Sequence, residues 1–485
     1  MIAVLYALAM TVLTVYGLNL FWLAVVCGRN DRLLPGPFPH PAQTDLPAIP
    51  VTVQVPLYNE ALVAERIIDA CARLRYAKGL LEIQILDDST DETVELIAER
   101  VHLWRSRGVD MHHIRRKDRT DFKAGALQHG LRSARGERIA VFDADFVPAP
   151  DFLRQVLPAF DDASVGMAQA RWGHLNAEDS LLTRIQAFGL DTHFAVEQYA
   201  RNRAGCFMNF NGTAGVWRRE CIEDAGGWHG DTLAEDLDLS YRAQLKGWQF
   251  RLLKNVEAPA ELPADINALR NQQFRWTKGA VETARKLLGA LWQSTQPWRV
   301  KLEGTLHLTT HVVFPFLTLA AVLHAPLLLL EAAGRGPGSV YFAFMGLGMA
   351  GFMGFFVAQL MAQRALYPNW GKRLLLFPLF MAGSMGMALS NTRAIWQGLR
   401  GKRSAFVRTP KYSAESWWNS RYADRRIPGI MWLEALLALY CMAGLVAISA
   451  QGAWAATPFQ AVFALAFTLV TIYNVQQIWL PRRRQ

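Results

Sequence analysis

The sequence predicts a mostly parallel α/β domain inserted between membrane-spanning α-helices. Three observations support this prediction: long stretches without charged residues, a central region that alternates short apolar runs with amphipathic stretches, and acidic residues where those runs end. The hydrophobic fraction is 52% and the charged fraction only 19%, which is too apolar for an ordinary soluble enzyme of this size. We therefore expect an integral membrane protein.

The membrane segments are predicted from their length and lack of charge. Residues 1–28 are predicted to form an N-terminal anchor, and Arg29 and Arg32 after it favour a cytoplasmic end. Residues 301–485 form a second membrane region with four predicted spans, at about 305–331, 338–363, 429–450 and 457–480.

A basic stretch lies between the second and third of these spans. Residues 393–426 hold nine Lys or Arg against Glu415 and Asp424, so this stretch is expected to be cytoplasmic. The α/β domain and this basic stretch are both expected on the cytoplasmic side, so the chain between them must cross the membrane an even number of times. We therefore interpret residues 374–396 as interfacial or re-entrant. The same excess of Lys and Arg beside membrane segments explains the net charge of +10, so this charge does not indicate nucleic-acid binding. The five cysteines are odd in number and show no CxxC pair, which favours neither disulfides nor a zinc site.

Residues 48–300 are predicted to form the cytoplasmic α/β domain. Apolar runs predict strands at 51–57, 82–86 and 138–142, and amphipathic stretches predict helices at 62–74, 92–105 and 124–134. Ligands bind at the carboxyl ends of parallel strands. The polar residues at three such ends are Tyr58-Asn59-Glu60, Asp87-Asp88 and Asp143-Ala144-Asp145.

Each acidic group has a structural and a functional interpretation. Asp143 and Asp145 are either turn formers or ligands of Mg²⁺ or Mn²⁺, which bind carboxylates and diphosphate oxygens together. Asp87 and Asp88 either precede a helix or hydrogen-bond a base and ribose. Lys123, just before a helix, is either solvated or supplies a positive charge to a diphosphate.

Two further clusters lie later in the domain. Glu235 and Asp236 open a predicted helix, whose dipole favours acids there and is expected to lower their pKa, leaving one ionised as a general base. In Gln272-x-x-Arg275-Trp276, the amide and guanidinium share a helical face, and the indole ring offers a flat platform for a sugar. The alternative is an amphipathic helix with tryptophan as an interfacial anchor.

Together these clusters resemble the D, D, D, Q-x-x-R-W signature of processive family-2 glycosyltransferases, the cellulose synthase superfamily. The resemblance covers residues 50–290 and is greatest to the cellulose-synthase-like A and C branches, which make mannan, glucomannan and glucan. The supporting strings are Asp121-Phe-Lys-Ala-Gly-Ala-Leu127, Asn209-Phe-Asn-Gly-Thr-Ala-Gly-Val-Trp217 and Ala234-Glu-Asp-Leu-Asp-Leu239. It implies a GT-A-type nucleotide-sugar-binding domain.

The resemblance also implies roles for individual residues. Asp236, with Glu235, would be catalytic, and Asp143 and Asp145 would bind Mg²⁺ or Mn²⁺. The implied donor-binding residues are Tyr58, Glu60, Asp87, Asp88, Lys123, Asp143 and Arg275, and the implied acceptor-binding residues are Gln272, Trp276, Asn211 and Gly212.

A second match lies in the predicted cytoplasmic loop at 400–426. Phe406-Val-Arg-Thr-Pro-Lys411 resembles the F-x-V-T-x-K gating loop of cellulose synthases, with Arg408 where that motif has valine. The match adds Thr409 and Lys411 to the donor-binding residues. The alternative is that this basic stretch only anchors to anionic headgroups.

The expected function is inverting transfer of a hexose from UDP-glucose or GDP-mannose to the end of a growing β-linked polysaccharide, coupled to export. The expected partners are a nucleotide sugar, a polysaccharide or lipid acceptor, membrane lipids and a cell-envelope export partner, with no nucleic acid. The expected location is the bacterial inner membrane or its equivalent. One alternative is a non-processive transferase acting on diacylglycerol or ceramide, and a more distant one is a non-catalytic channel or scaffold.

Overall fold

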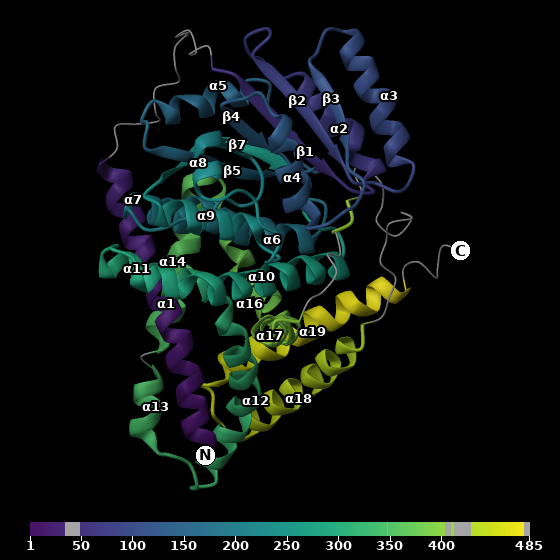
Figure 1. The fold of residues 1–485 in the computed structure, drawn as a ribbon. Helices are drawn as coiled ribbons and strands as arrows, with labels where there is room; N and C mark the ends of the chain where they lie inside the picture. Colours follow the sequence, from purple (N-terminus) through teal and green to yellow (C-terminus); the bar gives the residue numbers. More distant parts are fainter. Residues whose placement is uncertain (34–48, 347, 403–408, 412–427, 480–485) are drawn as a thin grey trace.

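A seven-stranded sheet forms the centre of the residues between 51 and 260 in the computed structural model (Figure 1). The structure describes residues 1–33, 49–346, 348–402, 409–411 and 428–479. The strands are β1 (Val51–Leu57), β2 (Leu81–Asp87), β3 (Met111–Arg115), β4 (Arg138–Val141), β5 (Val165–His174), β6 (Gly215–Arg218) and β7 (Gln249–Ala260).

The helices flank the sheet and extend below it (Figure 1). Those of the sheet domain are α2 (Ala61–Ala72), α3 (Thr93–Ser106), α4 (Phe122–Ser133), α5 (Phe152–Val156), α6 (Leu181–Thr192), α7 (Tyr199–Arg203), α8 (Arg219–Asp224), α9 (Glu235–Leu245) and α10 (Ile266–Gln293). The others are α1 (Ile2–Leu33), α11 (Trp298–Leu308), α12 (Val313–Ala332), α13 (Ser339–Gly346), α14 (Gly348–Leu366), α15 (Trp370–Arg373), α16 (Phe377–Gly386), α17 (Ala388–Leu399), α18 (Ile430–Ala450) and α19 (Thr457–Trp479). Short 3₁₀ turns occur at η1 (Leu157–Phe160), η3 (Thr310–Val312) and η4 (Leu374–Leu376), and a π-helix at η2 (His193–Gln198).

The sheet has the order β3-β2-β1-β4-β6-β5-β7, and only β6 runs antiparallel to its neighbours. The register aligns Leu57 at the end of β1 with Asp87 at the end of β2, and Gln54 with Val141 at the end of β4. The chain after each of these strands therefore emerges at one edge. The predicted fold class, a mostly parallel α/β domain accompanied by long apolar helices, is confirmed.

Alternation along β4 shows how the sheet is covered on both faces. Ala140 packs into a core shared with α2, α3 and α5, whereas Ile139 and Val141 pack into a second core shared with α4, α8 and α9. Successive strand residues point to opposite faces, so each face receives its own apolar layer. The second core also contains residues of α1 and α14, which attach the apolar helices directly to the sheet domain.

Five helical stretches are long and apolar enough to cross a membrane among the residues described. They are Ile2–Arg29, Thr310–Ala332, Ser339–Leu366, Ile430–Ala450 and Thr457–Gln477. The pair 370–386 and 388–399 is bent by 42°, as in a broken span or a re-entrant loop. Its interfacial placement stays a prediction. Of the predicted gating loop, residues 403–408 and 412–426 lie outside the described residues.

The contact between α1 and α14 depends on glycines. A Cβ on Gly17 would lie 2.5 Å from Cα of Gly351, and one on Gly354 would lie 2.2 Å from the carbonyl oxygen of Gly17. Distances this short leave no room for a side chain. Small residues at such a crossing let two helix backbones approach closely, as is typical of helices that associate in lipid.

Helix α10 lies between the sheet domain and the apolar helices (Figure 1). It begins at Asp265, whose carboxylate accepts a hydrogen bond from the Ala268 amide (2.9 Å) and caps the first turn. One turn later, Arg270 donates to Glu434 of α18 (2.9 Å) and to Asn474 of α19 (2.8 Å). All three of these side chains are at most 5% exposed, so a buried ion pair connects α10 to the last two helices.

Replacing Arg270 with methionine should destabilise this junction by about 3–5 kcal/mol, because Glu434 would be left buried without its cation. Thermal unfolding of the detergent-solubilised protein measures the change. The double variant Arg270→Met with Glu434→Gln removes the uncompensated charge and should recover part of the loss. Equal melting temperatures for the single variant and the wild type would show that the ion pair does not stabilise the junction.

Candidate active site

A cavity of about 200 Å³ opens at the carboxyl edge of the sheet. Of the site residues predicted from the sequence, all except Asp87 line it. They are Tyr58, Glu60, Asp88, Lys123, Asp143, Asp145, Asn211, Gly212, Glu235, Asp236, Gln272, Arg275, Trp276, Thr409 and Lys411. Side chains up to 353 positions apart in the sequence, from 58 to 411, therefore surround one cavity.

The two aspartates at the end of β2 point in different directions. Asp87 is 1% exposed, accepts a hydrogen bond from the Ser89 amide (2.8 Å) and lies 2.8 Å from Nε2 of His113. Burial raises the pKa of Asp87, but these hydrogen bonds outweigh burial and leave the pKa below its ordinary value. Asp88 faces the cavity and accepts two hydrogen bonds from Arg116, of 2.7 and 2.6 Å. A ligand in the cavity therefore reaches Asp88, while Asp87 is directed into the interior.

Each aspartate after β4 is paired with a lysine from a distant segment. Lys123 Nζ lies 2.6 Å from the Asp143 carboxylate, and Lys411 Nζ forms an ion pair with Asp145. The Asp143 amide donates to the Thr213 hydroxyl (2.9 Å), which fixes the backbone at the first of the two aspartates. The segment 409–411 therefore reaches the same carboxylate pair as the sheet domain's own lysine.

Lys123 occupies the centre of the acidic cluster. Its ammonium also lies 3.7 Å from Glu235 and donates to the Gly212 carbonyl (2.8 Å). Burial alone would lower the pKa of Lys123, but the charges of Asp143 and Glu235 raise it above the ordinary value. The lysine is thus a fixed positive charge. Its helix is entered through two non-glycine residues with positive φ, Asp121 (58°) and Phe122 (46°), a strained turn of the kind that clusters at functional sites.

The acid pair at the start of α9 differs from the expectation drawn from the helix dipole. Burial raises the pKa of both Glu235 and Asp236, and the charge of Glu235 raises that of Asp236 further, to about 7. Lys123 opposes this rise without cancelling it. The expected lowering is therefore wrong, because desolvation and mutual repulsion outweigh the dipole. Asp236 is a carboxylate whose affinity for a proton is matched to neutral pH.

Gly212 lets the backbone approach Asp236 closely. Its φ is +81°, and a Cβ there would lie 2.9 Å from Oδ2 of Asp236. The other oxygen, Oδ1, accepts a hydrogen bond from the Leu237 amide (2.7 Å). One oxygen is therefore held by the helix, and the other is directed toward the loop that contains Gly212.

Helix α10 contributes the guanidinium and the indole ring. Arg275 donates to the Thr409 hydroxyl (2.8 Å), and burial lowers its pKa to about 10, which leaves it charged at neutral pH. The Trp276 ring lies 6.5 Å from that of Trp172, which in turn lies 5.5 Å from Phe146. One side of the cavity is therefore an aromatic wall.

Several lining residues were not predicted from the sequence. Trp172 lies on β5, and Glu261 directly follows β7. Neither strand was predicted from the sequence. Arg119 places its guanidinium 3.3 Å from the centre of the Tyr58 ring. The apolar run 165–170 and the run of alternating residues at 250–258 were the available signals for these strands.

The π-helix η2 positions Asn211. Gln198 donates to Oδ1 of Asn211 (3.0 Å), and Nδ2 of Asn211 lies 3.0 Å from Nε2 of His193. These two partners are five residues apart, the spacing that a π-helical turn brings onto one face. Such single π-helical turns occur frequently at functional sites. Both ends of the Asn211 amide are therefore fixed by the same short helix.

The charge of the lining suits a cation. Among the described residues, seven carboxylates face the cavity, against four Lys or Arg. The acids are Glu60, Asp88, Asp143, Asp145, Glu235, Asp236 and Glu261, and the bases are Arg119, Lys123, Arg275 and Lys411. Asp143 and Asp145 pair with two different lysines, Lys123 and Lys411, and do not share a single ammonium. Oxygen ligands of this kind fit Mg²⁺ or Mn²⁺, so the residues present fit such an ion.

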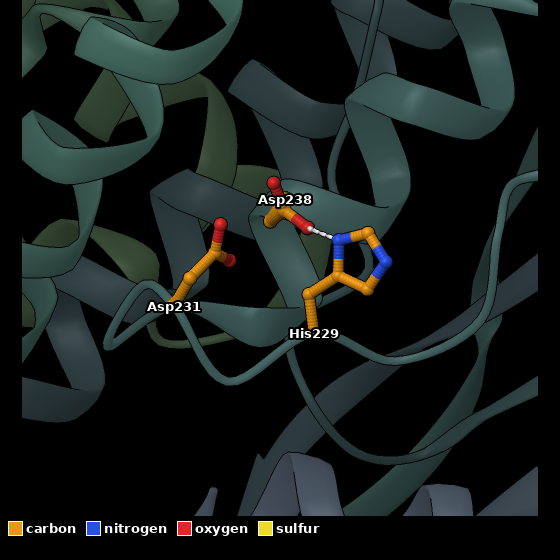
Figure 2. A group of neighbouring side chains, drawn as sticks. All are labelled: His229, Asp231 and Asp238. Atoms are coloured by element: carbon orange, nitrogen blue, oxygen red, sulfur yellow. Dashed lines mark ion pairs between the residues drawn. The ribbon is translucent and has the colours of Figure 1, made fainter.

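A second group with metal-ligand chemistry, His229, Asp231 and Asp238, behaves differently (Figure 2). Lys286 Nζ lies 2.8 Å from both carboxylates and 3.3 Å from Nδ1 of His229. Arg242 also lies 2.7 Å from Asp238. An ammonium therefore already occupies the position that a metal ion would take, and we interpret the group as an ion-pair network between α9 and α10.

Comparison with known proteins gives a consistent result. Residues 47–279 match the family described as glycosyltransferase like family 2. A probable glucomannan 4-beta-mannosyltransferase 15 of Arabidopsis thaliana is 42% identical over 242 residues, 49% of this chain and 45% of that protein. Glucomannan 4-beta-mannosyltransferase 1 of Oryza sativa subsp. japonica is 42% identical over 243 residues, 49% of this chain and 47% of that protein. The chain thus spans about half the length of these relatives.

A solved structure shares the fold. It is the mannosyltransferase PcManGT from Pyrobaculum calidifontis, in complex with GDP-Man and Mn²⁺. It aligns with a TM-score of 0.55 over 83% of this chain and 100% of that chain, at 20% identity. At this identity the likeness concerns the fold alone.

An ion-pair network at His229, Asp231 and Asp238 and a metal centre there predict different effects of removing Lys286. Lys286→Met should lower the free energy of unfolding by about 1–3 kcal/mol, because the fully buried Asp238 would keep only Arg242 as its cation. Thermal unfolding measures it. The control is Lys246→Met, which removes an exposed lysine paired only with the exposed Asp224 and should change little. A variant as stable as the wild type, and further stabilised by added divalent metal, would contradict the ion-pair interpretation.

Proposed function

We propose that this chain, which carries a family-2 glycosyltransferase domain over residues 47–279, is a membrane-embedded inverting hexosyltransferase. Its proposed donor is a nucleotide sugar, with GDP-mannose favoured over UDP-glucose, and its proposed acceptor is the end of a growing β-linked polysaccharide. The observation that carries the proposal is the carboxylate of Asp236, with a pKa raised to about 7, in a cavity at the carboxyl edge of the sheet that also holds Lys123, Arg275 and Lys411. The plant relatives are named as glucomannan 4-beta-mannosyltransferases, which supports mannose as the sugar.

Donor binding is proposed to depend on fixed positive charge. Lys123, Arg275 and Lys411 approach the cavity from three separate segments and present three cationic groups to a diphosphate. Arginine binds two phosphate oxygens with its planar fork, and lysine acts as a point charge. Asp143 and Asp145 would hold Mg²⁺ or Mn²⁺, which when bound neutralises the negative charge that develops on the leaving diphosphate.

Proton removal is proposed to be the task of Asp236. Its pKa of about 7 makes it a stronger base than an ordinary aspartate, and such a base contributes most when its pKa lies near the working pH. As the acceptor hydroxyl attacks the anomeric carbon, the C–O bond to the diphosphate breaks and the hydroxyl proton moves to Asp236. The aromatic wall of Trp276 and Trp172 is proposed to hold the acceptor sugar by its flat CH face.

Segment 409–411 is proposed to close the site over the donor. Thr409 accepts a hydrogen bond from Arg275, and Lys411 pairs with Asp145, so the two residues contact the groups proposed to bind the diphosphate and its metal ion. A segment that contacts the donor site between membrane helices is suited to gating it. The cytoplasmic orientation and an inner-membrane location are further parts of this proposal.

One observation favours a second candidate, transfer of a single sugar to a lipid. The cavity next to the catalytic one is lined mainly by apolar side chains, among them Ile185, Phe380 and Val470. An acyl chain is the simplest occupant for such walls. The two candidates differ in product length and in the polarity of the acceptor.

The direct test is transfer by the purified full-length protein with GDP-mannose or UDP-glucose, Mn²⁺ and a β-linked oligosaccharide acceptor. The proposal predicts a ladder of extended products on a gel, with a preference for GDP-mannose. Asp236→Asn should lower transfer on the order of 10²-fold or more while donor binding stays near wild type, because only the proton acceptor is lost. A wild-type rate in this variant, or a single lipid-linked product, would contradict the proposal.

Glu235 is expected to set the pH dependence of transfer. Its negative charge raises the pKa of Asp236, so Glu235→Gln should lower that pKa. Asp236 would then remain ionised at lower pH, and the acid limb of the pH profile of kcat/KM should move toward lower pH. Asp88→Asn, which removes the charge of a different lining acid that is paired with Arg116, is the control. An acid limb that stays in place in Glu235→Gln would show that another group sets it.

A further inference from the structure

The segment that leads to the proposed base, residues 231–236, lies along one face of α10. Four residues of α10 share this face, because they follow one another at intervals of three or four positions. They are Arg275, Gly279, Glu282 and Lys286. The last three meet the segment in reverse order, at Ala234, Leu233 and Asp231. The helix and the segment are therefore held in register at three successive points.

The contact at Glu282 is a hydrogen bond to the backbone. Oε2 of Glu282 accepts from the Leu233 amide, at 2.9 Å. Leu233 lines the catalytic cavity together with residues 234–236, which include the proposed base, whereas Glu282 does not line it. A side chain outside the cavity therefore holds the backbone three residues before Asp236.

The neighbouring contact leaves no space between the helix and the segment. A Cβ on Gly279 would lie 2.7 Å from Cβ of Ala234 and 2.8 Å from its amide nitrogen. Glycine therefore lets the backbone of α10 approach the segment directly, and any larger residue would displace the segment. The separation between α10 and the start of α9 is set by this contact.

Helix α9 has no local cap to fix where it begins. Its N-cap residue, Ala234, makes no side-chain capping hydrogen bond. Thr232, two positions earlier, has a hydroxyl with no hydrogen-bond partner among the described residues. Helices α6 and α10 differ, because the side chains of Ser180 and Asp265 cap them. The position of Asp236 in the first turn of α9 therefore depends on the contact with α10.

Glu282 is itself oriented by a buried lysine. Its other oxygen, Oε1, lies 3.6 Å from Nζ of Lys278, whose side chain is fully buried. The same ammonium donates to the Lys402 carbonyl (2.5 Å), three residues after the end of α17. The carboxylate is therefore directed toward the segment by a contact that extends to the chain after α17.

We propose that Glu282 is a positioning residue for the proposed glycosyl transfer. By holding the Leu233 amide, it fixes Asp236 of α9 relative to α10. Helix α10 carries Arg275 and Trp276, the groups proposed to bind the diphosphate and the acceptor sugar. The distance between the base and these groups therefore depends on contacts between two helices. This inference rests on the proposed function and adds a residue that touches neither donor nor acceptor.

The kinetic test compares Glu282→Ala with Glu282→Gln in the full-length, detergent-solubilised protein. Alanine removes the hydrogen-bond acceptor, whereas glutamine keeps a carbonyl oxygen. With GDP-mannose and a β-linked oligosaccharide, Glu282→Ala should lower kcat about tenfold or more and leave the KM for GDP-mannose within about twofold of wild type, because a displaced base slows the reaction without changing donor contacts. Glu282→Gln should recover most of kcat. A wild-type kcat in Glu282→Ala, or equally slow alanine and glutamine variants, would overturn the proposal.

Amide hydrogen exchange measures the positioning without any transfer. In Glu282→Ala, loss of the hydrogen bond to Leu233 should speed exchange in peptides that cover residues 231–237 about fivefold or more, and exchange elsewhere should stay near wild type. Glu282→Gln should keep the wild-type rate. Unchanged exchange in this segment, or faster exchange throughout the sheet domain, would show that Glu282 has no positioning role.

A second variant and a matched control complete the test. Gly279→Ala keeps every hydrogen-bonding side chain but displaces the segment from α10, so it should also lower kcat. Asp162 is an exposed carboxylate outside the catalytic cavity that likewise accepts from a backbone amide, that of Ser164 (2.9 Å). Asp162→Ala should leave kcat and the exchange of residues 231–237 unchanged. A wild-type kcat in Gly279→Ala would contradict the proposal.

The exchange measurement separates this inference from the proposed function. A wild type that protects residues 231–237 through Glu282 but transfers no sugar would contradict the transferase proposal alone. Transfer by the wild type, with neither rate nor exchange altered in Glu282→Ala, would overturn the positioning role alone.

Discussion

The charge balance of one cavity is the constraint on which the site depends. Seven carboxylates line a space of about 200 Å³. Two unit charges 4 Å apart interact by about 4 kcal/mol at an effective dielectric constant of 20, so carboxylates gathered in this way must be compensated or protonated. Lysine and arginine supply part of the compensation, and Asp236 responds by a raised pKa. A bound divalent cation would add positive charge that this balance lacks, and would offset the charge of a diphosphate that binds with it.

Helix α10 connects the three parts of this system. Near its start, Arg270 pairs with Glu434 of α18. In its middle, Arg275 and Trp276 face the catalytic cavity. Further along, Lys286 pairs with Asp238, two residues after the proposed base in α9. A shift of this helix would therefore move its contact with α18, the Trp276 ring and its contact with α9 together.

The sequence was informative where chemistry follows from local position. Asp143, Asp145 and Asp88 were predictable because an acid after an apolar strand must emerge at the carboxyl edge of a parallel sheet. The choice between Asp87 and Asp88 was not, because it depends on which of them meets His113 of the neighbouring strand. The pKa of Asp236 was predicted with the wrong sign, since burial by distant segments outweighs the local helix dipole.

Residues that act through tertiary contact were not visible in the sequence. Trp172 of β5 joins the aromatic wall only because its ring lies near the Trp276 ring of α10 in space. The π-helical turn that holds Asn211 has no distinct sequence pattern. Motif reasoning therefore located the catalytic cavity, whereas the apolar cavity next to it required the structure.

Mutual dependence of metal and nucleotide binding tests the charge-balance account most directly. Calorimetric titration of GDP into the full-length protein, with and without Mn²⁺, measures the coupling free energy, which must equal the effect of GDP on Mn²⁺ affinity. The account predicts that each ligand tightens the other, and that Asp145→Asn reduces this coupling. GDP affinity that is the same with and without Mn²⁺ would contradict it.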